Sequence, residues 1–354
     1  TRKSANMFHD ALVPFAERRN IKMKKIIKTV YPPITTYPSI ANILSLKWGE
    51  KEKIMPWIGD HLIQIIVRPR HQHTFGDFYD HADLDNFYRL MYGMPGLEWM
   101  RVNKPVAAFT KFSDYVEHLI DRDYCLEACL DRFYFEFSES YNKTHYIHST
   151  FIYGYDNEKN IMYIADFFSG DRYEKKEVSY DEINASMNNN WIIAIFGNGE
   201  TEYQLNEKLM KISFEEYLNS RDSFKKYEFS HHEYNQDVIY GLEYYDYLID
   251  RIKRDGFVDV RMYHLLYDHK ILMKFRLEYL VELERYNSDK LESLIKKTET
   301  LIHESLVTRS CAMLFDFNKT KAKEDNLIEM IANLKQKDRE FVEETLCMLN
   351  ETIN

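Results

Sequence analysis

Cysteine is scarce in this chain, and none of it lies in the first third. The four cysteines among 354 residues are Cys125, Cys129, Cys311 and Cys347. So few thiols exclude a disulfide-stapled secreted scaffold and are typical of a protein from a reducing compartment. Because no thiol precedes Cys125, a cysteine nucleophile on an N-terminal helix is excluded as well.

Long apolar runs and an excess of positive charge are also missing. No stretch approaches the roughly 18 apolar residues that a membrane-spanning helix needs, and no apolar core of a secretion signal is visible. The net charge is −10, which argues against nucleic acid or an anionic membrane as a partner. We therefore expect a cytoplasmic protein with neither partner.

The sequence also has no glycine-rich phosphate loop and no Cys-x-x-Cys pair, so we expect no cofactor. His71, His73 and His81 are residue types that ligate metals. They lie in a polar stretch that reads as a solvated loop, and we predict no metal site there.

Proline is confined to the front of the chain, with seven of eight between Pro32 and Pro105. A chain of this length favours two domains. The apolar residues from Leu291 to Leu306 repeat at i, i+3, i+4 and i+7, which predicts a helix, and those from Leu327 to Leu349 predict another helix or pair. We predict an α+β fold with an N-terminal segment at 1–25, an α+β domain at 26–205 and an all-helical domain at 206–354.

Short apolar runs bounded by turn residues predict the strands of the front domain. They cover residues 62–67, 106–112, 133–137, 151–153, 161–165 and 191–196.

The most informative segment is a predicted hairpin with a histidine at one end and an aspartate at the other. Its strands run from His148 to Tyr153 and from Ile161 to Asp166, joined by a turn that includes Gly154. The two outer ends of a hairpin lie side by side, so His148 and Asp166 are expected within hydrogen-bond reach. A carboxylate beside an imidazole fixes its tautomer and stabilises its charged form, as in a nucleophile–base–orienter triad. A hairpin that ends in these residues by chance is the alternative interpretation.

Four short motifs around this hairpin carry a resemblance to a known family. They are Leu130-Asp131-Arg132-Phe133-Tyr134, His145-Tyr146-Ile147-His148, Tyr153-Gly154-Tyr155-Asp156 and Ala165-Asp166-Phe167-Phe168. Together they resemble the core of the butirosin-biosynthesis acyltransferase-like family, whose domains are papain-like. The resemblance implies an antiparallel sheet with a helical C-terminal domain. It also implies transfer of an acyl group from a carrier-protein thioester to an amine, through a cysteine acyl-enzyme.

The position that matches the family's nucleophile departs from the pattern. It falls at the start of a predicted helix that begins at Pro38, where helix N–H groups can activate a thiol and bind an oxyanion. Tyr37 stands there in place of the cysteine. Either Ser39 replaces the thiol, or Tyr37 acts as an acid or base, or the pocket binds without covalent catalysis; these alternatives stay open.

Two functions follow from these residues. The first is an acyltransferase or amide-forming protein of natural-product biosynthesis, with His148 as base, Asp166 as its orienter and His145 as the substitute base. Its partners are an acyl or peptidyl carrier protein and a small-molecule amine. Asp131, Tyr134 and His145 are the expected binding residues. The second function is that of a catalytically inactive homologue, an accessory subunit that binds a carrier protein or synthetase.

Overall fold

The computed structural model divides the chain into two compact units. One comprises residues 1–51 and 93–202, and the other residues 52–92 and 203–354. The structure describes residues 22–36, 38–68, 75–78, 94–103, 111–168, 172–187, 192–200, 202–221 and 238–351. The segment 52–92, which the sequence analysis assigned to the front domain, thus groups with the C-terminal part of the chain.

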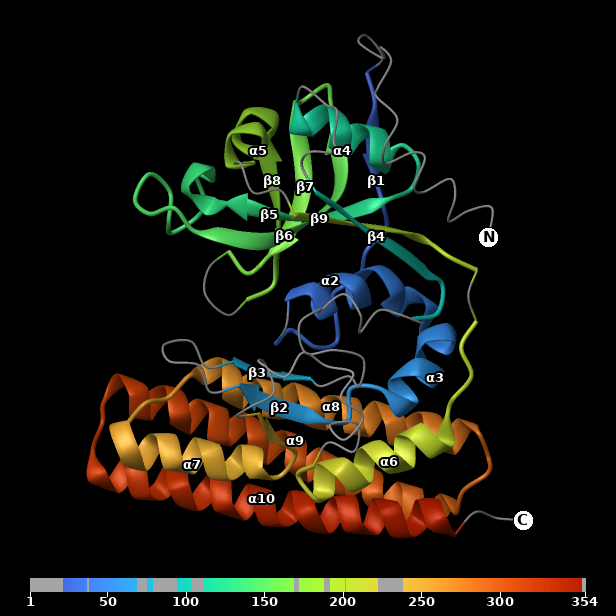
Figure 1. The fold of residues 1–354 in the computed structure, drawn as a ribbon, viewed down its shortest axis with the longest axis vertical. Coiled ribbons are helices and arrows are strands. Elements are labelled where there is room, and N and C mark those ends of the chain that lie inside the picture. Colours follow the sequence, from blue (N-terminus) through green and yellow to red (C-terminus); the bar gives the residue numbers. More distant parts are fainter. Residues whose placement is uncertain are drawn as a thin grey trace. The chain divides into compact units, whose positions relative to one another are not determined.

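A seven-stranded antiparallel sheet forms the centre of the first unit (Figure 1). The strands hydrogen-bond in the order β4-β9-β5-β6-β7-β8, and β1 pairs with β6. Their bounds are β1 Lys24–Ile26, β4 Leu97–Asn103, β5 Cys125–Asp131, β6 Ile147–Asp156, β7 Ile161–Asp166, β8 Glu174–Ser179 and β9 Ile192–Asn198. The predicted α+β class and the predicted hairpin, now β6 and β7, are confirmed.

Helices cover both faces of this sheet (Figure 1). One face packs on α2 (Pro38–Lys47), which the 3-10 turn η1 (Trp48–Glu50) follows. The other face packs on α4 (Phe112–Ile120) and α5 (Tyr180–Ser186) and contains a core of aliphatic and aromatic side chains. The predicted helix from Pro38 is therefore confirmed, and it lies against the sheet as expected.

Gly154 lies inside β6, although the sequence suggested a turn there. The β6–β7 register shifts between Ile152 and Gly154, which marks a bulge. Strand β1 pairs with β6 at this point, and a Cβ on Gly154 would lie 2.8 Å from the carbonyl oxygen of Lys25. Glycine is required here because the β1 backbone approaches so closely.

Two other predicted strands have different outcomes. Residues 133–137 do not form a strand, because the Asp131 side chain accepts a hydrogen bond from the Phe133 N–H and starts the 3-10 turn η4 (Arg132–Tyr134). Most of the strand predicted at 106–112 lies outside the described residues, and α4 begins at Phe112.

Long helices make up most of the second unit. They are α3 Lys51–Asp60, α6 Glu207–Leu218, α7 Glu243–Asp255, α8 Val260–Glu282, α9 Ser288–Phe317 and α10 Lys321–Asn350. The C-terminal helices are confirmed, with α10 as one helix rather than a pair. The part from 206 is not purely helical, because β10 (Ile239–Tyr240) pairs with β2 (Ile65–Arg68), and β2 with β3 (Phe75–Phe78).

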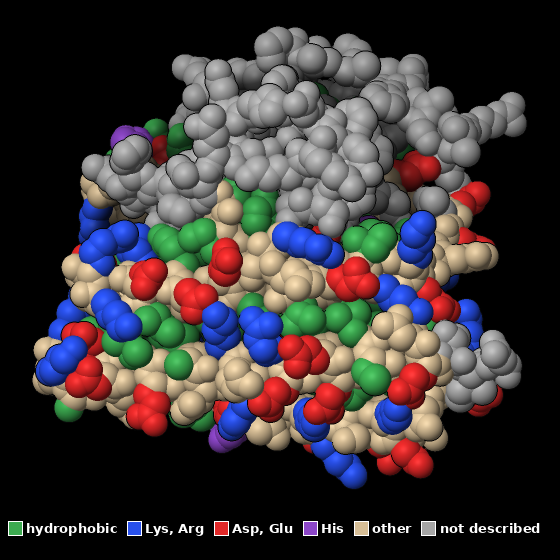
Figure 2. All heavy atoms as spheres, turned by 60° about the horizontal axis from the view of Figure 1, so that its bottom comes forward, with side chains coloured by type: hydrophobic (Ala, Val, Ile, Leu, Met, Phe, Trp, Pro, Cys, Tyr) green, Lys and Arg blue, Asp and Glu red, His purple; other side chains and the backbone are tan. Residues whose placement is uncertain are grey.

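The described surface of these helices carries both signs of charge in close alternation (Figure 2). Exposed ion pairs link neighbouring helices, such as Lys297 with Glu344 and Lys337 with Glu304. Among the described residues, none of the helices combines the length and apolar character that crossing a bilayer requires.

Candidate functional site

A polar cluster lies where β5, β6 and β7 end together in the first unit. Asp166 at the end of β7 is buried, and its Oδ2 lies 3.0 Å from Nδ1 of His148 near the start of β6. Thr150, two residues further along β6, donates a hydrogen bond to the same oxygen over 3.0 Å. The expected contact between His148 and Asp166 is therefore present; its catalytic role stays a prediction.

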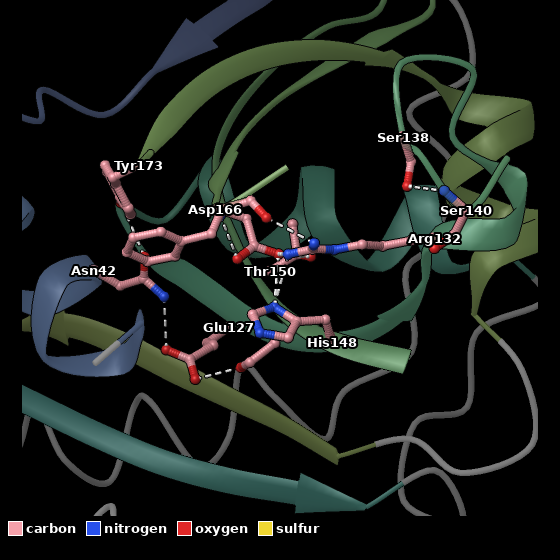
Figure 3. A network of polar contacts seen from close by, with 11 residues as sticks. Asn42, Glu127, Arg132, Ser138, Ser140, His148, Thr150, Asp166 and Tyr173 are labelled. Atoms are coloured by element: carbon pink, nitrogen blue, oxygen red, sulfur yellow. Dashed lines mark hydrogen bonds and ion pairs between the residues drawn. The ribbon is translucent and has the colours of Figure 1, made fainter. Parts of the chain in front are cut away.

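Arg132 is the member of this cluster that the sequence analysis missed. Its Nη2 lies 2.6 Å from Asp166 Oδ2 and 2.9 Å from His148 Nδ1 (Figure 3). Its Nη1 donates to the carbonyl oxygen of Phe167 over 2.7 Å. The guanidinium also lies over the rings of Tyr146 and Phe168, at 5.3 and 5.4 Å from their centroids. A cation thus shares the carboxylate with the imidazole.

The charge state of Asp166 follows from these neighbours. Burial alone would raise the pKa of its carboxyl group. The neighbouring side chains of His148 and Arg132 oppose that effect and hold the pKa below its ordinary value. Asp166 is therefore a carboxylate at neutral pH, and it accepts hydrogen bonds rather than donating them.

The register of the sheet decides which face carries the cluster. His148 lies directly opposite Leu130, and Thr150 opposite Ala128. Side chains opposite each other in an antiparallel pair share a face, and Leu130 and Ala128 belong to the core that packs on α4 and α5. His148, Thr150 and Asp166 consequently project from that face.

A second polar network occupies the opposite face, next to α2. Buried Glu127 of β5 accepts hydrogen bonds from Ser149 Oγ over 2.5 Å and from Asn42 Nδ2 of α2 over 3.0 Å. The Tyr173 hydroxyl donates to Asn42 Oδ1 (Figure 3). We predicted that the His148 ring lies between Asp166 and the start of α2. The described contacts do not support that position, because α2 packs on the face of the sheet opposite to the one that carries His148.

The structure does not place the side chains of Ser39, the candidate nucleophile, and Tyr37, the candidate acid or base. Tyr37 lies outside the described residues, and Ser39 lies in α2 with a side chain that is not described. No distance from Ser39 or Tyr37 to His148 therefore enters the description of the site. The same holds for His71, His73 and His81, which lie outside the described residues. Within the described part of the chain, no group of three acidic, histidine or cysteine side chains is arranged to hold a metal.

The predicted binding residues form a second histidine–aspartate pair. His145 Nδ1 lies 2.6 Å from Asp131 Oδ2, and the exposed His145 ring stacks on Phe133 at 4.3 Å. The other Asp131 oxygen accepts from the N–H groups of Phe133 and Tyr146. Tyr134 packs edge-on against Phe133. Asp131 therefore closes the connection between β5 and β6, a structural role that the sequence did not reveal.

The thiols do not supply an alternative nucleophile at this site. Burial raises the pKa of Cys125 far above the ordinary range of a thiol. Cys125 and Cys129 alternate along β5 with the core residues Leu126 and Leu130, so both thiols lie on the α2 face and not on the face that carries His148. Cys311 and Cys347 belong to α9 and α10 of the other unit.

Comparison with known proteins adds no assignment. No protein-family model matches the sequence, and a search of curated proteins finds none that is similar.

Proposed function

We propose that the protein transfers an acyl group from a carrier-protein thioester to a small-molecule amine, with His148 acting on the reactants. The observation that carries this proposal is the way His148 is held. Its Nδ1 is occupied by Asp166 and Arg132, whereas its Nε2 has no hydrogen-bond partner among the described residues and the side chain is 23% exposed. A fixed imidazole with one available nitrogen is suited to proton transfer or to polarising a carbonyl group.

The proposal includes a papain-like relationship for the first unit but not a cysteine acyl-enzyme. The antiparallel sheet with α2 on one face is compatible with that relationship. Position 37 carries tyrosine, and the two thiols of β5, Cys125 and Cys129, lie on the face opposite to that of His148. The amine therefore attacks the bound thioester directly, or Ser39 carries the acyl group in between.

Intact mass measurement tests the proposal. The protein is incubated with an acyl-loaded carrier protein, or with the N-acetylcysteamine thioester of the same acyl group, together with a panel of amines. We expect the donor to lose its acyl group to an amine. His148→Ala is expected to lower the rate by about 10²–10⁴-fold, the usual contribution of a positioned acid or base.

His303→Ala is the control, because it removes an exposed histidine on α9 of the other unit. We expect it to retain the transfer rate. Acylation through Ser39 would add the acyl mass to the peptide of residues 29–47. A rate that is the same in His148→Ala and in the unaltered protein would refute the catalytic assignment.

The second candidate function is an inactive accessory subunit that binds a carrier protein or synthetase. The ion pair between Arg132 and Asp166 favours it, because the carboxylate that would stabilise an imidazolium already compensates a guanidinium. This function would be supported if the carrier protein binds equally to the unaltered protein and to His148→Ala, and if neither of the two transfers an acyl group.

A further inference from the structure

We propose that Arg132 is a positioning residue that fixes His148 as the tautomer with its proton on Nε2, so that the site offers an N–H donor to an acceptor oxygen of its ligand. This inference deepens the proposed function and rests on it for the identity of that oxygen, the carbonyl of the thioester. The proposed function allows His148 to act either as a base or as a hydrogen-bond donor, and this inference decides between the two roles.

The hydrogen bonds around His148 Nδ1 support this tautomer. A guanidinium nitrogen carries only donors, and Arg132 Nη2 lies 2.9 Å from Nδ1. A proton on Nδ1 would face an N–H of Arg132 across that distance, whereas a bare Nδ1 accepts from it. The two hydrogens of Nη2 then serve Asp166 and His148, one each.

Arg132 cannot easily turn away to relieve such a conflict. Its Nη1 is bound to the Phe167 carbonyl oxygen, and its planar group lies against the Tyr146 and Phe168 rings. Asp166 Oδ2 accepts from Arg132 and from Thr150, and it also lies 3.0 Å from His148 Nδ1. A bare Nδ1 and the carboxylate oxygen repel each other at that distance, and the positively charged Nη2 group of Arg132, which donates to both atoms, offsets the repulsion. With Nδ1 as the acceptor, both terminal nitrogens of Arg132 and the Oδ2 atom of Asp166 have hydrogen-bond partners, whereas the buried Nε of Arg132 has none among the described residues.

The helical unit also contains a histidine, a cation and a carboxylate in contact, namely His269, Lys270 and Asp338. There a backbone carbonyl group fixes the tautomer of the histidine. Lys270 Nζ lies 2.9 Å from His269 Nδ1 and 2.5 Å from Asp338 Oδ2. His269 Nε2 lies 2.8 Å from the carbonyl oxygen of Ile63, which only accepts. His269 therefore has its proton on Nε2 and accepts from the cation at Nδ1, the arrangement inferred for His148.

The consequence separates this site from a nucleophile–histidine–aspartate triad. In a triad, the carboxylate accepts the Nδ1 proton and Nε2 removes a proton from the nucleophile. With the proton on Nε2, His148 instead donates to an oxygen that gains negative charge as the amine attacks. This role resembles that of an oxyanion-hole donor.

Nitrogen NMR of histidine tests the tautomer without any substrate. Protein labelled with ¹⁵N-histidine is examined by two-bond ¹H–¹⁵N correlation at pH 8, where an ordinary imidazole is neutral. The signals of His148 among the 13 histidines are those absent from His148→Gln. We expect a pyridine-type Nδ1 and a pyrrole-type Nε2.

Two variants discriminate the role of Arg132 from that of Asp166. Arg132→Met is expected to move the proton to Nδ1, because Asp166 is then the remaining partner. Asp166→Asn is expected to leave the tautomer unchanged, because Arg132 still donates to Nδ1. Arg122→Met is the control: Arg122 contacts Nδ1 of His118 over 3.1 Å, so it should alter the His118 signals and leave those of His148 unchanged.

A pyrrole-type Nδ1 in the unaltered protein, or a tautomer that changes in Asp166→Asn, would overturn the inference. If Arg132→Met does not fold, these two spectra still decide. The expected tautomer in a protein that transfers no acyl group would refute the proposed function alone. The opposite tautomer in a protein whose transfer depends on His148 would refute this inference alone. Where transfer occurs, Arg132→Met should lower kcat by about 10²-fold, as does the loss of one oxyanion donor, with little change in KM.

Discussion

Replacing Lys270 by methionine should strongly destabilise the helical unit. Lys270 on α8 and Asp338 on α10 are fully buried and 2.5 Å apart. The hydroxyl groups of Tyr217 and Tyr245 donate to the same Asp338 oxygen, over 2.5 and 2.8 Å. Asp338 Oδ1 has no hydrogen-bond partner among the described residues. The lysine is therefore the only cation bonded to Asp338 in this described network.

The magnitude follows from what the substitution leaves behind. Removing one partner of a buried ion pair costs about 3–5 kcal/mol, because the other charge stays buried without compensation. His269 Nδ1 also loses its donor. With a urea m-value of about 2 kcal/mol/M, a loss of about 4 kcal/mol lowers the unfolding midpoint by about 2 M.

Urea unfolding followed by circular dichroism at 222 nm is a suitable assay, because the long helices α6 to α10 belong to this unit. Lys274→Met is the matched control: Lys274 lies one turn further along α8 and pairs with Glu299 at the surface. Such exposed pairs contribute about 0.2–1 kcal/mol. In Lys270→Met/Asp338→Leu the uncompensated carboxylate is gone, and part of the loss should be recovered. Equal midpoints for Lys270→Met and Lys274→Met would refute this reasoning.

Three further predictions concern the same unit. Burial and the charge of Lys270 hold the pKa of His269 well below 6.5, so the unfolded state binds more protons below that pH. The free energy of unfolding should then fall as pH decreases from about 6.5, by up to about 1.4 kcal/mol per unit, and His269→Gln should remove this slope in urea titrations at several pH values. Gly241→Ala should destabilise more than Gly256→Ala. Both glycines have positive φ, but an added Cβ would lie 2.1 Å from the Tyr217 carbonyl oxygen at position 241 and 3.8 Å from its nearest neighbour at 256; thermal melts that rank them in reverse would contradict this. Arg276→Met should cost about 3 kcal/mol or more, because it strips the donors from the buried carbonyl groups of Ile58, Gly59 and His61, whereas exposed Arg285→Met should cost less than about 1 kcal/mol in the same melts.

The parts of the fold that could be predicted are those whose signal is local. The 3.6-residue period from Leu291 to Leu306 predicted α9, and the polar turn between two apolar runs predicted β6 and β7. The contact of His148 with Asp166 also followed, because a hairpin fixes which residues lie side by side.

The parts that could not be predicted depend on contacts between distant segments. Arg132 follows β5, and it reaches Asp166, 34 positions later, only because β5 and β7 flank β6. In the sequence it looks like any surface arginine; the apolar residues on both sides of it, Leu130 before and Phe133 to Phe135 after, are the one signal that could have indicated burial. Gly154 was interpreted as a turn residue because the approach of β1 comes from 128 positions earlier in the chain.

The two histidine–cation–carboxylate clusters differ in one respect that bears on function. In the helical unit both nitrogens of His269 have partners and the ring is fully buried, so no ligand reaches it without local unfolding. In the sheet unit, His148 is partly exposed and its Nε2 has no partner among the described residues. A similar set of groups therefore contributes to helix packing in one unit and leaves an imidazole partly exposed in the other. This difference in exposure is the reason for placing the candidate site at His148 and not at the fully buried His269.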